Sequence, residues 1–333
     1  MAEATIRDVA RLAEVSVASV SRALNGLDNV SDATRARVSA AATELGYVPH
    51  AGARSLSLSR THAIGVVLPD LFGEFFSEMV RGMDREAQAR GYMLLLSNIH
   101  ADAGQAATAL RAMRGRVDGL LVMAPHLSEE AVLQALPSAI PAVLLNSSLS
   151  IDGRTSLRID NGAGARAVAE HFIALGLKRI VHIRGPVGNI DAQERCEAFC
   201  DALAGHDAIA VEILQGDFSE ESGEAAIIEL IHSGRHFDAV FGGNDNMAIG
   251  ALQALRDAGL GVPDDVAVAG FDDIPMARHL GLTTVRVQIA ELGRRAVACL
   301  VPMLDGAAAA PGEGLQTPAL VVRATTTREK DDR

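Results

Sequence analysis

The stretch VSVASVSRALNG, residues 15–26, predicts a short amphipathic helix near the start of the chain. At 100° per residue, Val20 and Leu24 fall on one face and can pack against a neighbouring helix. The opposite face gathers one small apolar residue, two polar residues and one cation: Ala18, Ser21, Asn25 and Arg22. We therefore expect a helix with one buried face and one exposed polar face.

Capping residues place two further helices around this one. Thr5 and Asp8 fit a capping box at the start of the first helix, and Ser16 is suited to cap the second. Ser31 is placed to cap a third helix, which Gly46 ends. A second helix that follows the first after a three-residue turn has the spacing of a helix-turn-helix, in which the second helix enters the major groove of DNA.

The exposed side chains have chemistry that suits DNA. Arg22 can bind guanine or phosphate, while Ser21 and Asn25 can anchor the backbone. Val17 and Ala18 can contact thymine methyl groups. On these residues alone, a solvated face in a small helical bundle remains an alternative.

The sequence TIRDVARLAEVSVASVSRALNG, followed by VSDATRARVSAAATELGYVPHAGARSL, resembles the head of the LacI/GalR family of bacterial transcription regulators. The resemblance implies a DNA-binding head over residues 1–47. The residues that we expect to contact DNA through this head are Thr5, Ser16, Val17, Ala18, Ser21, Arg22, Asn25, Ser31 and Thr34.

Residues 48–61 read by themselves as a linker of small residues. The resemblance implies a hinge helix that forms on operator DNA, with Leu56 as a minor-groove wedge and Ala53 and Arg54 beside it. Such a wedge unstacks a flexible base step and bends the duplex. Gly52 within the hinge costs about 1 kcal/mol relative to alanine.

From residue 62 onward, short apolar runs alternate with helical patterns, which predicts an α/β fold with parallel sheets covered by helices. The predicted strands are Ala63–Leu68, Tyr92–Leu96, Gly119–Met123, Ala142–Leu145, Arg179–Ile183, Val211–Leu214, Ala239–Phe241 and Val266–Phe271. The length suits two halves, divided near Asp160 with a return near Gln288. We expect an effector-binding and dimerisation core over 62–333, with one subdomain at about 62–159 and 288–317 and the other at 160–287 and 318–328.

Polar residues follow most of these strands, and ligands of open α/β sheets bind outside the carboxyl ends of strands. The polar positions are Asp70, His126, Asn146, Asp160, Asn161, the segment 185–191, Asp217, Asn244, Asp245, Asp272 and Asp273. For any one of them a polar turn is an equal explanation. The repeated pattern predicts a cleft that holds a small polar ligand.

The segments VDGLLVMAP, GPVGNIDAQER, FGGNDNMAIGALQALRDAGLGVPDDVAVAGFDDIP and LTTV resemble the effector-binding core of the same family, whose two subdomains are arranged as in periplasmic binding proteins. The resemblance places Asn146, Asp191, Arg195, Asn244 and Asp272 at ligand hydroxyls and Phe218 against a ring. We add Asp70, Phe75, Phe76 and Asp160 to this effector site. Carboxylates and amides bind vicinal hydroxyls in pairs, so a sugar suits the set. A nucleoside or purine is the alternative, with few aromatic residues to hold its base.

Composition places the chain among cytoplasmic proteins. The net charge is −12, but residues 1–60 carry seven arginines against six acidic residues, so the acidity lies mainly in the core. No apolar run reaches the roughly 20 residues of a membrane span, and the amino terminus lacks a signal-peptide core. Cys196 and Cys200 lie one helical turn apart; of a redox, metal or small apolar role, we favour the last.

The sequence contains none of the common phosphate-binding, zinc-protease, nucleophile-elbow or dinucleotide motifs, so we expect neither an enzyme nor a cofactor or metal. A free-standing sugar-binding protein is a weak alternative, because a DNA-binding head stands in place of a signal peptide. One head reads only a few base pairs, so we expect a homodimer on a pseudo-palindrome. The expected function is a repressor released by a sugar-like effector, with a ligand that promotes binding as the alternative.

Overall fold

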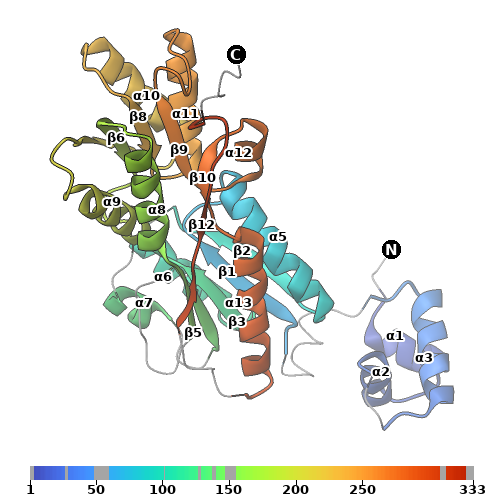
Figure 1. Ribbon diagram of the computed structural model, residues 1–333. Coiled ribbons are helices and arrows are strands. Elements are labelled where there is room, and N and C mark those ends of the chain that lie inside the picture. Colours follow the sequence, from blue (N-terminus) through green and yellow to red (C-terminus); the bar gives the residue numbers. More distant parts are fainter. Residues whose placement is uncertain are drawn as a thin grey trace.

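The computed structural model describes residues 4–26, 29–48, 60–100, 102–126, 129–136, 140–146, 155–307 and 313–327. These residues form a small helical head and a larger α/β core (Figure 1). The head contains α1 (Ile6–Leu12), α2 (Val17–Leu24) and α3 (Asp32–Glu44). Its own apolar cluster is centred on Val9, Val20 and Val38, which are fully buried.

The first sheet of the core has six strands in the order β11-β5-β4-β3-β1-β2, and every described pair is parallel. The strands of this sheet are β1 (Ala63–Leu68), β2 (Met93–Asn98), β3 (Gly119–Met123), β4 (Ala142–Leu145), β5 (Thr155–Ile159) and β11 (Glu313–Gln316). A parallel sheet needs helices on both faces, which explains why β1, β3 and β4 are buried along their whole length.

Alternate residues of β1 enter two different apolar clusters. Ile64, Val66 and Leu68 join the cluster that contains Met79 of α5 (Glu74–Ala89), whereas Ala63 and Val67 join the cluster formed with α6 (Ala103–Met113) and α7 (Glu129–Ala135). Along the first face α5 packs against α13 (Ile289–Leu304) (Figure 1). Gly82 permits this close packing, because a Cβ there would lie 1.9 Å from the Ala290 carbonyl oxygen.

The second sheet repeats the arrangement in the order β12-β10-β9-β8-β6-β7, with only the β10–β12 pair antiparallel among those described. Its strands are β6 (Arg179–Arg184), β7 (Ala210–Gln215), β8 (Ala239–Gly242), β9 (Ala267–Asp272), β10 (Thr283–Arg286) and β12 (Ala319–Val321). The helices that accompany it are α8 (Asn161–Ala174), α9 (Ile190–Leu203), α10 (Glu220–His232), α11 (Asp245–Asp257) and α12 (Pro275–His279).

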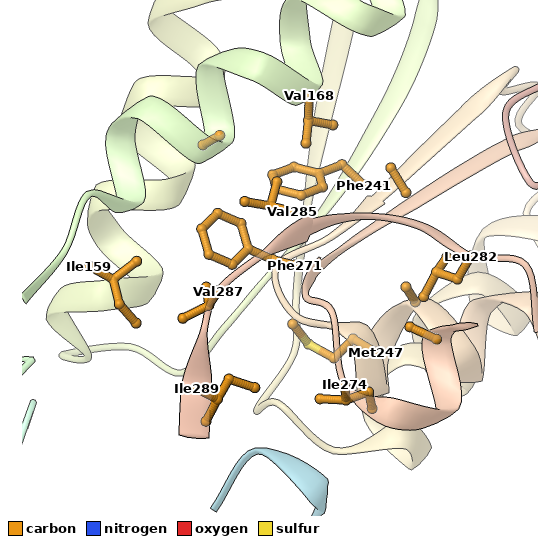
Figure 2. Close-up of a cluster of buried hydrophobic side chains, with 14 of the residues drawn as sticks. Ile159, Val168, Phe241, Met247, Phe271, Ile274, Leu282, Val285, Val287 and Ile289 are labelled. Atoms are coloured by element: carbon orange, nitrogen blue, oxygen red, sulfur yellow. The ribbon is translucent and has the colours of Figure 1, made fainter. Parts of the chain in front are cut away.

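The chain passes between the two sheets three times: after β5, between β10 and α13, and between β11 and β12. Apolar residues continue the core through the second passage. Figure 2 shows Val285, Val287 and Ile289 following one another along this passage, with the Phe271 ring beside them; all four belong to one buried apolar cluster that also contains Ile159. The two halves are therefore joined by short, partly buried segments, the geometry expected of a hinge.

The observed architecture confirms the predicted α/β fold with two parallel-sheet halves and a helical head. All eight predicted strands are present, with ends that differ from the predicted ones by at most two residues. Four further strands were not predicted: β5, β10, β11 and β12. β5, β10 and β11 contain Thr, Arg, Glu or Gln, and β12 is an apolar segment of only three residues, so none has the longer apolar run that marked the others. No helix in the described part of the chain is long and apolar enough to cross a membrane.

Candidate functional site

The head presents the predicted polar face of α2. Val17, Ala18 and Arg22 are exposed, and Val17 leaves 42% of its surface accessible although it is apolar. Ser21 and Asn25 are half-buried, with the Asn25 amide donating to the Ser21 hydroxyl at 3.4 Å. The structure therefore brings these five side chains to one face and leaves them free of the head's core.

The other predicted DNA contacts in the head lie at helix starts. Ser16 and Ser31 cap α2 and α3, because their hydroxyls accept from the backbone nitrogens of Ser19 at 3.1 Å and Thr34 at 3.3 Å. The Asp8 carboxylate accepts from the backbone nitrogen of Thr5 at 3.0 Å. These residues thus have a structural role beside any contact with DNA. Ala53, Arg54 and Leu56 lie outside the described residues.

A cavity of about 440 Å³ lies at the carboxyl ends of the strands of both sheets. This volume falls within the usual range for small-molecule sites. Its lining comes from strand ends, loops and helix starts of both halves: Pro69, Asp70, Phe72, Phe75, Phe76, His100, Met123, Pro125, His126 and Asn146 on one side, and Pro186, Asn189, Asp191, Arg195, Asp217, Phe218, Ser219, Asn244, Asn246 and Asp272 on the other.

Arg195 on α9 is the central cation of the cavity, with only 4% of its surface exposed. Its Nε donates to Asn161 Oδ1 at 2.9 Å, and its Nη1 donates to the Gly243 carbonyl at 2.7 Å. The guanidinium carbon lies 3.8 Å from the centroid of the Phe271 ring. Hydrogen bonds and ring stacking therefore fix the orientation of a buried charge.

Asp191 and Asp272 lie beside Arg195 in the wall of the cavity. The Asn161 amide donates to Asp191 at 2.7 Å, so Asn161 joins the carboxylate to the guanidinium. Arg195 Nη2 lies 3.4 Å from Asp272 Oδ1 as an ion pair. Burial raises the pKa of both carboxyl groups despite the opposing effect of Arg195, and the pKa of Asp272 reaches about 7.

Asn146 Oδ1 is buried in the cavity and has no hydrogen-bond donor among the described residues, while the buried Asp272 Oδ1 has only the 3.4 Å ion-pair contact with Arg195 Nη2. Buried polar atoms are normally hydrogen-bonded, so each is suited to accept from a donor on a bound molecule. Asn146 and Asp272 also have positive φ angles, 45° and 119°. Strained backbone of this kind is concentrated at functional sites and costs about 1–3 kcal/mol per residue.

Phenylalanines form the apolar part of the wall. Phe75 and Phe76 meet edge to face, with ring centroids 5.3 Å apart, and Phe72 lies at the rim, where it is exposed. The Phe218 ring occupies space that Gly185 leaves open, since a Cβ on Gly185 would lie 2.3 Å from the ring. The Asn244 amide donates to the Phe218 carbonyl at 3.0 Å and holds that segment in place.

The structure brings nine of the ten predicted effector-site residues to the cavity wall, and Asp160 is the exception. The Asp160 carboxylate caps α8 by accepting from the Ala163 nitrogen at 2.8 Å, and it lines a separate surface hollow with Arg158 and Glu194. The structure therefore does not bring Asp160 to the cavity. A residue at the end of a strand and the start of a helix can serve as a helix cap, which is the role it has here.

Other strand-end residues are also structural. Asp245 is fully buried and accepts from the Ile274 nitrogen at 2.9 Å, and Asp273 binds Arg323 at 2.6 Å. The cavity residues that the sequence prediction missed are Phe72, His100, Met123, Ser219 and Asn246. Of these, His100 is the second residue after the end of β2, so the rule of polar residues after strand ends was sufficient to find it. No cluster of three or more His, Cys, Asp or Glu suited to a metal occurs among the residues that the structure describes.

Comparisons with known proteins agree with both parts of the molecule. Residues 5–50 match the family described as bacterial regulatory proteins, lacI family, and residues 169–326 match the periplasmic binding protein-like domain. The chain is 39% identical to the ribose operon repressor of Escherichia coli (strain K12) over 306 residues, which cover 90% of this chain and 92% of that protein.

Two solved structures are similar over nearly the whole chain. The lac repressor dimer bound to operator and an anti-inducer matches with a TM-score of 0.88 and 29% identity, covering 98% of this chain and 100% of that one. The complex of the transcriptional regulator CelR with cellobiose matches with a TM-score of 0.71 and 31% identity, covering 97% and 99%.

Proposed function

Because the chain belongs to the LacI family of bacterial regulatory proteins, we propose that it is a cytoplasmic repressor that leaves its operator when a sugar-like effector enters the cavity. The observation that carries the effector half is the pair of buried acceptors, Asn146 Oδ1 and Asp272 Oδ1, beside the Arg195 guanidinium. The regulator works by binding two ligands, DNA and effector, and not by catalysis.

The DNA half of the proposal rests on the exposed face of α2. Arg22 binds a guanine edge or a phosphate, and Val17 and Ala18 contact thymine methyl groups. Ser21 and Asn25 bind the backbone, which sets the register of the helix in the groove. Thr5, Ser16, Ser31 and Thr34 are proposed to add backbone contacts, since helix starts present N–H groups to phosphate.

We assign residues 1–47 to the head, 48–61 to the hinge and 62–333 to the core, with the two subdomain ranges given above. Within the hinge, Leu56 is the proposed minor-groove wedge, with Ala53 and Arg54 beside it. A hinge that becomes ordered only on DNA lets the core control DNA binding. Ordering the hinge costs free energy, and one conformation of the core supplies that free energy while another does not.

The effector half follows from the geometry of the polar wall. Arg195 donates, and Asn146 and Asp272 accept, so a vicinal diol is bound by complementary pairs. The relatives support this chemistry, since one is named a ribose operon repressor and another structure holds cellobiose. Asp70, Asp191, Asn244, Phe75, Phe76 and Phe218 complete the proposed site.

A second candidate effector is a nucleoside. Four phenylalanines line the cavity, more than the sequence prediction allowed for: Phe72, Phe75, Phe76 and Phe218. Such a wall suits the face of an aromatic base as well as the C–H side of a sugar ring. The diol of a ribosyl group would bind the same polar groups in either case.

Dimerisation is proposed at the edge of the first sheet. On the edge strand β2 three apolar side chains are exposed: Met93 by 66%, Leu95 by 39% and Leu96 by 42%. An apolar edge strand invites pairing with another chain, so a second copy is the proposed cover. Two heads are then held at the spacing of operator half-sites. An effector that bridges both halves of the core changes the spacing of the two heads if it binds the DNA-bound and the released conformation with different affinity.

The effector class is tested by calorimetric titration of the purified protein with ribose, other pentoses, hexoses and nucleosides. The proposal predicts saturable one-to-one binding of a sugar that weakens when Asn146 is replaced by alanine. A nucleoside that binds while its free sugar does not would select the second candidate. Tight binding that is unchanged in Asn146→Ala would contradict the assigned site.

A further inference from the structure

The wall of the cavity carries more acidic than basic side chains. Four carboxyl groups line it, those of Asp70, Asp191, Asp217 and Asp272. Among the described residues of the wall, Arg195 supplies the only guanidinium and no lysine is present. Asp191 and Asp272 are buried, whereas Asp70 and Asp217 are exposed to solvent. A bound molecule therefore meets carboxyl groups both in the buried part of the cavity and at its opening.

Hydrogen bonds hold the two exposed carboxylates in place. Asp70 Oδ1 accepts from the backbone nitrogen of Leu71 at 2.7 Å. Asp217 Oδ1 accepts from the backbone nitrogen of Ser219 at 2.9 Å and also from the Ser219 hydroxyl. Burial by itself would raise the pKa of Asp217, but hydrogen bonds from Ser219 and Ser222 outweigh it and lower the pKa below its usual value. Asp217 is therefore a negative charge at the opening at neutral pH.

The buried polar atoms of the wall that lack a close partner are acceptors. Asn146 Oδ1 has no donor among the described residues, and Asp272 Oδ1 has only Arg195 Nη2 at 3.4 Å. In the described part of the wall, no buried side-chain nitrogen lacks an acceptor. Hydroxyl groups can donate to such atoms, whereas an ionised phosphate ester offers only acceptor oxygens. The cavity therefore suits a ligand that is rich in hydrogen-bond donors.

The guanidinium of Arg195 is already bound by the protein. Its Nε donates to Asn161 Oδ1 at 2.9 Å, and its Nη1 donates to the Gly243 carbonyl at 2.7 Å. Arginine typically binds phosphate through two parallel N–H···O bonds from one edge of the guanidinium. Each edge of Arg195 includes a nitrogen that already donates to the protein. Arg195 is therefore poorly placed to bind a phosphate group in this two-bond geometry.

Helix starts, the other common binding elements for anions, are also occupied at this cavity. Three helices begin at its wall, and the side chains of Asn189, Ser219 and Asn244 accept from the backbone nitrogens of their first turns. The first turns of the helices at the wall also contain acidic residues: Asp191 in α9, Glu220 and Glu221 in α10, Asp245 in α11 and Glu74 in α5. A helix start attracts an anion through its free N–H groups and its partial positive charge. Side-chain caps and carboxylates already meet both at these starts.

We propose that the cavity selects an unphosphorylated effector and rejects the phosphate esters of the same molecule. This inference rests on the proposed function, because it takes the cavity as the effector site. A phosphate group would bring nearly two negative charges and only acceptor oxygens to a wall of carboxylates and unpaired acceptors. Like charges brought together in a binding site weaken binding by about 100-fold or more. The selection applies to a sugar and to a nucleoside alike.

The test is calorimetric titration of the full-length protein with matched pairs of ligands. The pairs are ribose and ribose 5-phosphate, glucose and glucose 6-phosphate, and adenosine and adenosine 5′-monophosphate. In any pair whose free member binds, the ester should bind at least about 100-fold more weakly at low salt. Raising the salt from about 0.01 M to about 0.5 M should narrow this ratio, because salt screens charges that are exposed to solvent. Rejection by size alone would not depend on salt.

A single substitution separates charge from shape. Asp217→Asn keeps an acceptor oxygen for Ser219 and removes the charge, so it should narrow the ratio of the two affinities about fivefold at low salt. Asp207→Asn is the matched control, because Asp207 is an exposed acidic residue that does not line the cavity. The ratio in this control should equal that of the wild type.

An ester that binds as tightly as its free parent would overturn the inference. A ratio that neither salt nor Asp217→Asn changes would also overturn it, because the rejection would then not be electrostatic. A protein that binds neither member of any pair would overturn the proposed function, and the charge selection with it. The two failures are therefore distinguished by whether an ester binds.

Discussion

Replacing Arg195 with methionine should reduce both stability and effector affinity, and the structure sets the magnitude. The guanidinium loses hydrogen bonds to Asn161 and Gly243, each worth about 1.5–3 kcal/mol when one partner is charged. Methionine offsets part of this loss of free energy, because it removes a buried cation that is costly to desolvate. Asp272, whose pKa is about 7, also takes up a proton readily once its partner is gone. We therefore expect a net loss of about 2–4 kcal/mol in the free energy of unfolding.

The assay is urea unfolding followed by circular dichroism, together with calorimetric titration of the effector. Effector affinity should fall on the order of 10- to 100-fold, the equivalent of one charged hydrogen bond. The double variant Arg195→Met with Asp272→Asn should regain at least about 1 kcal/mol of stability without regaining affinity, because it removes the unpaired carboxyl group. Arg235→Met is the matched control, since Arg235 pairs with Glu212 at the surface and should cost under about 1 kcal/mol. An Arg195→Met variant as stable as this control would show that the buried guanidinium does not stabilise the core.

Three further outcomes follow from the structure. Arg22→Ala should weaken operator binding on the order of 10- to 100-fold and leave effector affinity unchanged, as measured by fluorescence anisotropy and calorimetry; equal loss of both would contradict the separation of the two sites. Burial raises the pKa of Asp272 from 3.8 to about 7, so its neutral form stabilises the fold below pH 4 and this stabilisation is lost as the pH rises through 7. Between pH 5 and pH 8 the free energy of unfolding should fall more in the wild type than in Asp272→Asn. Equal losses in the two proteins would contradict the raised pKa of Asp272. Gly82→Ala should lower the free energy of unfolding by about 3 kcal/mol or more, because its Cβ would collide with the Ala290 carbonyl. Gly205→Ala, where a Cβ has open space, should lower it by under about 1 kcal/mol. Equal shifts of the two variants in thermal melts would contradict the close packing of α5 and α13.

Periodicity and capping residues were sufficient to predict most of the fold. The run of apolar residues in β1 and the caps at Ser16 and Ser31 are local signals, and each produced the predicted element. The strands β10 and β12 are defined by pairing with each other and with β9, which is a long-range interaction. The mixed sequence of β10 and the three-residue length of β12 carry too little local information for a prediction.

Most of the candidate site, like most of the fold, could be predicted from the sequence. Residues after strand ends are brought together by the parallel topology, so Asn146, Asp191 and Asp272 were found from the sequence. Asp160 has the same local signature, yet it points to the start of α8 and caps it. Asn161, by contrast, lines no part of the cavity but orients both Asp191 and Arg195. Only side-chain geometry separates these roles.

The measurement that tests the account most directly is a gel shift of the purified protein on the DNA upstream of its own gene. It should be made at a fixed, stated salt concentration, because affinity for DNA depends strongly on salt. The account predicts a shifted band without ligand that disappears when one sugar is added and persists with the same sugar in the Arg195→Met variant. A band that forms only in the presence of ligand, or that no sugar or nucleoside removes, would contradict release of the operator by an effector bound in the cavity.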